Sequence, residues 1–395
     1  MSTAAPKWKI WSKRIHIDKD IRQAVLAQLD NLQQGIYFGG DLVYQLERDF
    51  SRYIGVPYAV AVNSGTSALL VALLTLDLGP GDEILVSANS YVSSAEIPAF
   101  VGAVPVFCDV DYDTANVTAA TLAPRITART RAIALTHMYG QPVDMDPVME
   151  LARRHNLYVI EVCPHALGAE YRGRKAGSFG DIGVFSVGNK NIAVGGHGGL
   201  VTTGSRDLYE KAAAIAHHGW PRLPVDDPGS DPGMFRTDRN PVRPGLNIQL
   251  EGMACAIALV GMRKLDQWNE RRRRVASSYT RLIEAARLPV RPLAVRDDVR
   301  HCYLHYVVRA PRRDELRQAL ADEGIEARVH YPITLPDLDY YHRHFPTAAE
   351  CYPNARRLAG EVLTLPTHPW LAEGDLEAVV GTMTEFYRPT RRGSG

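Results

Sequence analysis

The chain has 395 residues, of which 46% are hydrophobic and 23% are charged, and its formal net charge is +1. This composition is ordinary for a folded globular protein and argues against disordered and fibrous classes. A near-neutral charge creates no strong global field toward nucleic acid or an anionic membrane, so neither is expected as a partner.

Length and cysteine content bear on the number of domains and on the presence of disulfides or metal sites. At about 150 residues per domain, the chain is long enough for two domains. Its five cysteines are widely spaced and form no CxxC pair, which argues against a disulfide framework and a zinc ribbon. No stretch approaches the ~18 apolar residues of a membrane span, and the first residues lack the apolar core of a signal peptide. We therefore expect a cytoplasmic protein without a metal site.

The predicted elements begin with two amphipathic helices, at residues 21–32 and 42–55. Between residues 58 and 91, a β-branched run turns at Ser-Gly-Thr into an apolar helix, stops at Gly-Pro-Gly and enters a second strand. Short strands and one helix follow, with strands at 104–111, 130–140, 157–163 and 181–187 and the helix at 146–156. Strands that alternate with helices predict a mostly parallel sheet, with a ligand site beyond the C-terminal strand ends.

The second half of the chain changes character at residues 221–245, which are rich in Pro, Gly and Asp and predict a long loop. Residues 251–288 predict one long helix or two in succession. We interpret the basic block Arg271–Arg274 within them as a solvated or subunit-facing stripe. Further elements are predicted as strands at 302–310 and 326–331 and helices at 313–325 and 375–387. We expect a large domain, residues 1–250 with the N-terminal helices, and a small C-terminal α/β domain, residues 251–395.

One lysine has unusual surroundings. Lys190 directly follows a predicted core strand and precedes the run 195–199, in which four of five residues are glycine. A lysine in a cleft loses hydration, so its pKa falls and the neutral amine can form a Schiff base with an aldehyde. On spacing alone, an exposed loop lysine is an equal alternative.

Two other segments, near predicted strand ends, carry groups that could bind a ligand. Ser64, Gly65 and Thr66 open an apolar helix, where free N–H groups and the helix dipole form an anion site. Ser and Thr are also ordinary N-cap residues, so this signal is weak by itself. Tyr91 follows the next strand, where its ring could stack on a heteroaromatic cofactor or belong to the core.

Taken together and in order, these segments resemble a known family. The resemblance is carried by "VNSGTSALLVALL", "GPGDEILVSANSYVSSA", "HMYGQPVDMDPVMELA", "NKNIAVGGHGG" and "GLNIQLEGMACAI". Over roughly residues 21–387 the chain is similar to the pyridoxal-phosphate-dependent sugar aminotransferases of the DegT/DnrJ/StrS type, fold type I. The resemblance implies an α/β fold with a mostly parallel mixed sheet in the large domain and a smaller C-terminal α/β domain.

The same resemblance implies a cofactor, pyridoxal 5'-phosphate, and roles for individual residues. Lys190 would hold it as a Schiff base and later move the proton between the substrate carbon and the cofactor. Gly65 and Thr66 would bind the phosphate together with Ser186, and Tyr91 would stack on the ring.

Two further residues complete the implied site. His165 would lie near the cofactor's phenolic oxygen. Asn247 would reach the phosphate of the neighbouring subunit, which implies a homodimer with shared active sites. The implied reaction moves an amino group from Glu or Gln to a keto-sugar or keto-cyclitol, in antibiotic or other specialised-metabolite biosynthesis.

One departure from the family pattern bears on the reaction. Val162 stands where the family has the aspartate that pairs with the protonated pyridine nitrogen, so the cofactor is expected to be a weaker electron sink. Glu161 is adjacent, but neighbouring strand residues face opposite sides, so it should point away unless the strand is bulged. An enzyme that uses the cofactor without transamination, such as an epimerase or dehydratase, is therefore an alternative. A non-catalytic regulator or binding protein on this fold is a third.

Smaller departures accumulate nearby. His197 replaces a glutamate common in the family. It could act as a second acid or base near the lysine, or it could simply fill a tight turn. Gln249 replaces a common arginine, and the shorter spacing from Phe185 to Lys190 makes Ser186 a less secure phosphate ligand. His217 and His218 precede the predicted loop and could meet substrate, although chance placement is common with 13 histidines in the chain.

Overall fold

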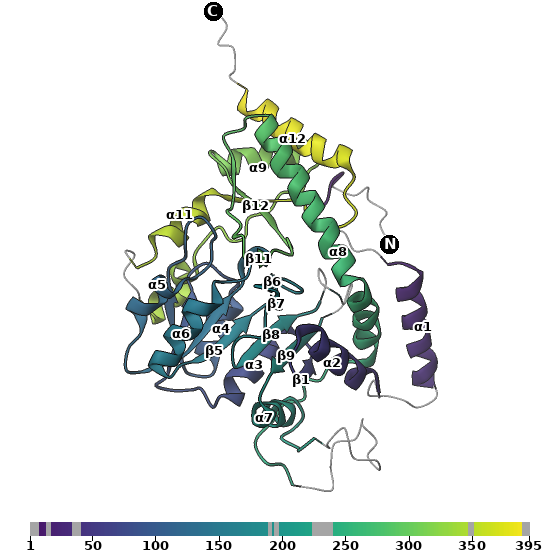
Figure 1. The fold of residues 1–395 in the computed structure, drawn as a ribbon, viewed down its shortest axis with the longest axis vertical. Coiled ribbons are helices and arrows are strands. Elements are labelled where there is room, and N and C mark those ends of the chain that lie inside the picture. The colour runs from purple at the N-terminus through teal and green to yellow at the C-terminus, as the bar shows by residue number, and fades with distance from the viewer. Residues whose placement is uncertain are drawn as a thin grey trace, which may run out of the picture.

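The computed structural model describes residues 8–12, 17–33, 41–188, 192, 197–222, 240–346 and 351–388. Lys190 and most of the predicted loop at residues 221–245 lie outside the described residues. A seven-stranded sheet forms the centre of the larger part of the molecule, seen in the lower half of Figure 1. In spatial order its strands are β1 (Tyr58–Val62), β9 (Gly199–Thr203), β8 (Ile182–Ser186), β5 (Tyr158–Val162), β4 (Thr130–Thr136), β2 (Glu83–Ser87) and β3 (Val104–Cys108).

Five of these strands are parallel neighbours, from β8 through β5, β4 and β2 to β3. Strand β9 pairs antiparallel with β8 on one side and with β1 on the other, so β9 alone runs in the opposite direction. Parallel neighbours need crossover connections, which here are mostly helical. The helices of this part are α3 (Gly65–Thr75), α4 (Ser93–Phe100), α5 (Ala119–Leu122), α6 (Met145–His155) and α7 (Arg206–Ala216), with 3-10 turns at Ala123–Arg125 and Met138–Gly140. The predicted mostly parallel mixed sheet is confirmed.

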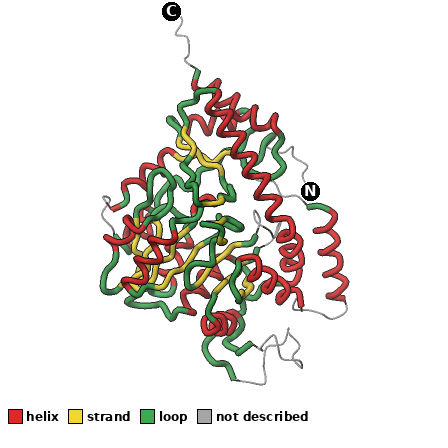
Figure 2. The backbone as a smooth tube through the Cα atoms, in the orientation of Figure 1, coloured by secondary structure: helices red, strands yellow, loops and turns green. Residues whose placement is uncertain are grey.

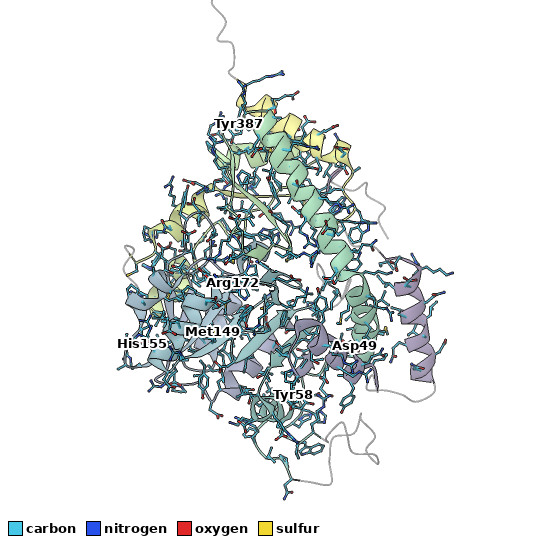
Figure 3. All side chains as sticks on the ribbon, viewed as in Figure 1. Asp49, Tyr58, Met149, His155, Arg172 and Tyr387 are labelled. Atoms are coloured by element: carbon cyan, nitrogen blue, oxygen red, sulfur yellow. The ribbon has the colours of Figure 1, made fainter. Side chains whose placement is uncertain are left out.

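Alternate residues of a strand face opposite sides, and β1 shows how this builds two cores. Val60 and Val62 pack with the residues of α3 and the central strands. Ala59 and Ala61 face the other side, against residues of α2 (Asp41–Ile54) and α8 (Gly252–Ala285). Tyr58, labelled in Figure 3, starts the same strand. Its ring stacks on that of Tyr209 of α7, with the ring centroids 4.9 Å apart.

The predicted helix at residues 251–288 is one continuous helix of 34 residues, α8, which runs from the sheet to the upper part of the molecule (Figures 1 and 2). The first helix, α1 (Lys19–Gln33), packs along its lower half. The interpretation of the basic block as a solvated stripe is wrong for Arg272, which is 5% exposed and donates to Asn269 Oδ1 over 2.7 Å. Asn269 in turn donates to the carbonyl oxygen of Leu167 over 3.0 Å, so Arg272 lies on the inner face of α8.

The C-terminal unit surrounds a second sheet, in the order β10-β12-β13. Its elements are β10 (Arg291–Pro292), β12 (Tyr306–Arg309), β13 (Val362–Leu365), α9 (Arg313–Asp322), α10 (Asp339–His344), α11 (Pro353–Glu361), α12 (Glu373–Tyr387) and the 3-10 turn Leu335–Asp337. A third small sheet joins β11 (Val299–Arg300), β6 (Glu170–Tyr171) and β7 (Arg174–Lys175). The C-terminal unit has its own core, in which α8 and α12 cover β12 and β13. The expected boundary at residue 250 coincides with the start of α8, and we keep it as a proposal.

The predicted strand at residues 326–331 is wrong. Of this segment, Arg328 alone forms a β-bridge, to Thr364. The Arg328 guanidinium folds back onto Glu326 Oε1 at 2.9 Å from Nε, and the chain then leaves the sheet edge. This departure carries His330 and Tyr331 toward a cavity at the large sheet. Among the helices of the described residues, none is long and apolar enough to span a membrane.

Candidate active site

A cavity of about 420 Å3 opens beyond the C-terminal ends of the parallel strands. Its walls come from the start of α3, the segment after β2, the ends of β4, β5 and β8, and the C-terminal unit. Ligands of open α/β sheets bind at this edge because the loops that follow the strands converge there. The cavity therefore lies where the alternation of strands and helices predicts it.

The first turn of α3 forms one end of the cavity. Ser64 caps this helix, since its Oγ accepts the N–H of Ser67 over 3.0 Å. The N–H groups of Gly65 and Thr66 meet no acceptor among the described residues, and Thr66 is exposed to the cavity. Free N–H groups and the positive end of the helix dipole together attract an anion such as a phosphate.

Ser186, the last residue of β8, packs directly against this turn. A Cβ atom added to Gly65 would lie 2.7 Å from the Cβ of Ser186, so no side chain fits at residue 65. Across the strand pair, a Cβ atom on Gly199 would lie 2.1 Å from the carbonyl oxygen of Ser64. Glycine at both positions lets three backbone segments converge, which brings the N–H groups and the Ser186 hydroxyl to one small region.

Two tyrosine rings form another wall. Tyr91 follows β2 and is 56% exposed, with its ring centroid 6.1 Å from that of Tyr331. Burial raises the pKa of Tyr331 above its ordinary value, so its hydroxyl stays protonated at neutral pH. An exposed aromatic face at the mouth of a cavity suits a flat ring, which would bury both surfaces by stacking.

His165 occupies the inner part of the cavity and is 8% exposed. Its Nδ1 accepts the N–H of Tyr139 over 3.4 Å, so a neutral imidazole carries its proton on Nε2. The ring centroids of His165 and His305 are 4.9 Å apart, and those of His305 and His330 are 4.2 Å apart. This packing fixes the orientation of the His165 ring.

Val162 and Glu161 face opposite sides of β5, as predicted. Val162 is 4% exposed and lines the cavity. Glu161 is fully buried on the other side, where it contacts His137 Nε2 at 3.0 Å and accepts three N–H groups of the turn 177–180. Burial would raise the pKa of Glu161, but these donors outweigh it and hold the pKa below its ordinary value. No carboxylate lies among the described residues that line the cavity.

Glu161 also belongs to a group of three metal-type ligands, with His137 and Cys163, whose ligand atoms lie within 4.8 Å of one another. His137 Nδ1 accepts the N–H of Val143 over 2.9 Å, and the Cys163 thiol contacts the carbonyl oxygen of Glu161 at 3.5 Å. Burial raises the pKa of Cys163 well above its ordinary value, which disfavours the thiolate that binds metals. Hydrogen bonds inside the protein account for this group.

Of the remaining predicted site residues, one lines the cavity and the others do not. His197 is exposed and lines the cavity. His217, His218, Asn247 and Gln249 are not among its lining residues. His217 is hydrogen-bonded to Gln249, and burial, with His218 and Arg222 nearby, lowers its pKa to about 4. Lys190 lies outside the described residues, although β8, which precedes it, ends at the cavity.

Sequence reasoning missed several residues that the fold brings to the cavity. They are Ser90, Ser94, Thr136, Val184, His330 and Tyr331. Thr136 and Val184 lie within predicted strands, and their places beside Val162 follow only from the strand order, which the sequence does not display. Of these residues, Ser90 alone could have been found from its position in the sequence, because it directly precedes Tyr91. His330 and Tyr331 belong to the segment mistaken for a strand.

Comparisons with known proteins agree with this architecture. A sequence profile described as the DegT/DnrJ/EryC1/StrS aminotransferase family matches residues 16–384. GDP-perosamine synthase from Caulobacter vibrioides is 34% identical over 98% of this chain and 98% of its own. A protein named pleiotropic regulatory protein, from Geobacillus stearothermophilus, is also 34% identical, over 94% of this chain and 96% of its own.

A solved structure shows the same likeness in three dimensions. DesV from S. venezuelae, in complex with a ketimine intermediate, superposes with a TM-score of 0.84 and 32% identity. The match covers 93% of this chain and 94% of that chain. The expected fold type I is confirmed by this likeness. The chain belongs to the DegT/DnrJ/EryC1/StrS aminotransferase family and is an enzyme of that family.

Proposed function

We propose that this protein is a pyridoxal-phosphate-dependent aminotransferase that moves an amino group from Glu or Gln to a keto-sugar or keto-cyclitol. The observation that carries the proposal is the packing of the α3 N-terminus against Ser186 inside a cavity that also holds Tyr91 and His165. An anion site, an aromatic face and a hydrogen-bond donor occur together in about 420 Å3, a space suited to a phosphorylated pyridine and part of a substrate.

Each residue has a distinct task in this proposal. Gly65, Thr66 and Ser186 bind the phosphate, and Tyr91 stacks on the ring. His165 lies near the phenolic oxygen of the cofactor. Lys190 holds the cofactor covalently and, once released by the substrate, moves the proton at the substrate carbon. The bound cofactor supplies the electron sink for the carbanion that proton removal leaves.

A sugar as amino acceptor is supported by the relatives, since GDP-perosamine synthase is named for a sugar nucleotide product. A biosynthetic role in antibiotic or other specialised metabolism remains part of the proposal. The homodimer with shared sites is also part of the proposal. It is supported by Asn247, because this residue is exposed and is not among the residues that line the cavity of its own chain. A cytoplasmic location is proposed as well.

The test is the absorption spectrum of the purified protein with pyridoxal phosphate, before and after L-glutamate or L-glutamine is added. We expect a visible Schiff-base band that the amino donor converts to the shorter-wavelength band of the aminated cofactor. Lys190→Ala should lack the visible band. Lys175→Ala is the control, because Lys175 pairs with Glu170 and neither residue lines the cavity. A visible band that survives Lys190→Ala would contradict the proposal.

A second function, catalysis by the cofactor without transamination, is favoured by one observation. Val162 and Val184 face the cavity where a carboxylate would strengthen the electron sink. A weak sink favours steps such as epimerisation or dehydration that avoid a long-lived carbanion. Under this alternative, the visible band forms but ignores both amino donors, and Val162→Asp restores the response. Rapid conversion by the wild-type protein would exclude it.

A further inference from the structure

Three residues of neighbouring strands lie side by side at the cavity. Thr136 of β4 is in register with Val162 of β5, and Val162 is in register with Val184 of β8. Residues in register on parallel strands point to the same face, so the three side chains form one row. All three line the cavity, and all are at least 96% buried, since their exposed fractions are 4%, 4% and 1%. The row offers a single polar group, the Thr136 hydroxyl.

That hydroxyl belongs to a short chain of hydrogen bonds. Thr136 Oγ1 lies 2.9 Å from Ser90 Oγ, which in turn lies 2.8 Å from Ser94 Oγ. Ser90 and Ser94 are 3% and 1% exposed and also line the cavity. Three hydroxyl groups supply three hydrogens, and the two bonds among them use two. One O–H hydrogen is therefore left to donate to an acceptor other than these three hydroxyl groups.

The chemistry of the proposed cofactor indicates what accepts it. In pyridoxal phosphate, the ring nitrogen lies opposite the carbon that bears the aldehyde. Val162 stands where the family resemblance places the aspartate that pairs with this nitrogen, so we expect the nitrogen to face the row that contains Val162. A protonated, positively charged nitrogen needs a carboxylate there, and none lies among the described lining residues. An unprotonated nitrogen is neutral and accepts a hydrogen bond from a hydroxyl.

Glu161 cannot supply the missing charge. Its two oxygens accept from His137 and from three backbone N–H groups on the far side of β5. Turning its side chain into the cavity would leave these buried donors without an acceptor, which is costly. The row that contains Val162 is therefore built for a neutral ring.

We infer that the hydroxyl chain Ser94–Ser90–Thr136 donates a hydrogen bond to the unprotonated pyridine nitrogen, in place of the carboxylate that Val162 removes. This inference rests on the proposed function, because it needs pyridoxal phosphate in the cavity. It deepens that function by assigning the ring a neutral state, which makes Thr136 and Ser90 positioning residues for the cofactor.

The test uses the full-length protein reconstituted with pyridoxal phosphate that carries nitrogen-15 in the ring, whose NMR shift reports protonation and hydrogen bonding directly. We expect an unprotonated nitrogen in the wild type from pH 6 to 9 and a protonated one in Val162→Asp. Thr136→Val and Ser90→Ala should shift the signal toward that of a nitrogen without a donor and raise the Kd for the cofactor about 3- to 10-fold.

Two controls separate a lost hydrogen bond from general damage. Thr136→Ser keeps the hydroxyl and should restore the wild-type shift. Thr75→Val makes the same change at a buried threonine of α3 that does not line the cavity, and should alter neither the shift nor the Kd. A protonated nitrogen in the wild type, or a signal unmoved by Thr136→Val and Ser90→Ala, would overturn the inference while the proposed function stands. If the wild type forms no Schiff-base band, the proposed function fails and the inference fails with it.

Discussion

Gly65 has no room for a side chain, because the packing of α3 against β8 places Ser186 where a Cβ atom would lie, with 2.7 Å between the two Cβ atoms. Gly65→Ala must push the first turn of α3 away from Ser186. We expect a loss of about 1–3 kcal/mol in the free energy of unfolding, as for other overpacked sites. The Kd for pyridoxal phosphate should rise at least about 10-fold.

Urea unfolding and a spectroscopic titration with the cofactor measure these two effects. Gly204→Ala is the matched control, because nothing lies within 4 Å of the Cβ atom that it adds. Unchanged cofactor affinity in Gly65→Ala would show that this turn does not hold the phosphate.

Glu161 makes the stability depend on pH at the acid end. Its folded-state pKa lies below the ordinary value, because hydrogen bonds from His137 and the turn 177–180 outweigh burial. The ionised carboxylate therefore stabilises the fold above the unfolded-state pKa of ~4.3, and this contribution is lost as the pH falls through the lower folded-state value. Glu161→Gln should cost roughly 2–4 kcal/mol at pH 7, and the difference from wild type should shrink below about pH 4.

Denaturant unfolding of both proteins between pH 3 and pH 7 measures this difference. Glu377→Gln, an exposed position of α12, serves as the control and should follow the wild type throughout. A gap between Glu161→Gln and wild type that stays constant down to pH 3 would show that ionised Glu161 is not the source.

At the scale of elements, α3 contains a buried polar atom that it does not use. Thr75, its last residue, is fully buried, and its Oγ1 has no hydrogen-bond partner in the described part of the chain. Valine has nearly the same shape without the hydroxyl, so Thr75→Val removes an unpaired polar group from the core. We expect it to raise the free energy of unfolding by roughly 1 kcal/mol.

The contrasting change is Thr202→Val in β9. Thr202 is also fully buried, but its Oγ1 donates to the carbonyl oxygen of Gly177 over 3.0 Å. Here the same substitution should destabilise by about 1–3 kcal/mol, because that buried carbonyl loses a donor. Thermal unfolding of the two variants should therefore shift in opposite directions, and equal shifts would refute the distinction.

For the whole molecule, the proposed shared site makes a reciprocal prediction about mixed dimers. When Lys190→Ala is on one subunit and Asn247→Ala on the other, one of the two sites receives both intact residues, if Asn247 acts across the interface. Such a heterodimer, purified through two different tags, should keep about half of the wild-type activity. When both substitutions are on the same subunit beside a wild-type partner, each site is missing one residue.

The two arrangements contain the same substitutions, so their comparison controls for expression and stability. An Asn247 that acts within its own chain predicts the opposite pattern, with the half-activity in the second arrangement. The exposed position of Asn247 outside its own cavity is the reason to expect the first.

The order and type of most elements could be predicted from the sequence, because periodicity and the positions of Gly and Pro are local properties. The sequence also located Gly65, Thr66, Tyr91, His165 and Ser186 as neighbours, through a resemblance that spans nearly the whole chain. The side on which Glu161 lies followed from the period of a strand. These features depend on residues close together in the sequence or on a pattern recognised along it.

Features that depend on contacts between distant segments could not be predicted from the sequence and became known from the fold. The strand order places Thr136 beside Val162, although 26 residues separate them in the chain. Burial of Arg272 and the departure of His330 from a sheet edge arise from packing that no local pattern encodes. The fold determines which side chains are neighbours, because burial in the hydrophobic cores on the two faces of the sheet determines which strands lie next to each other.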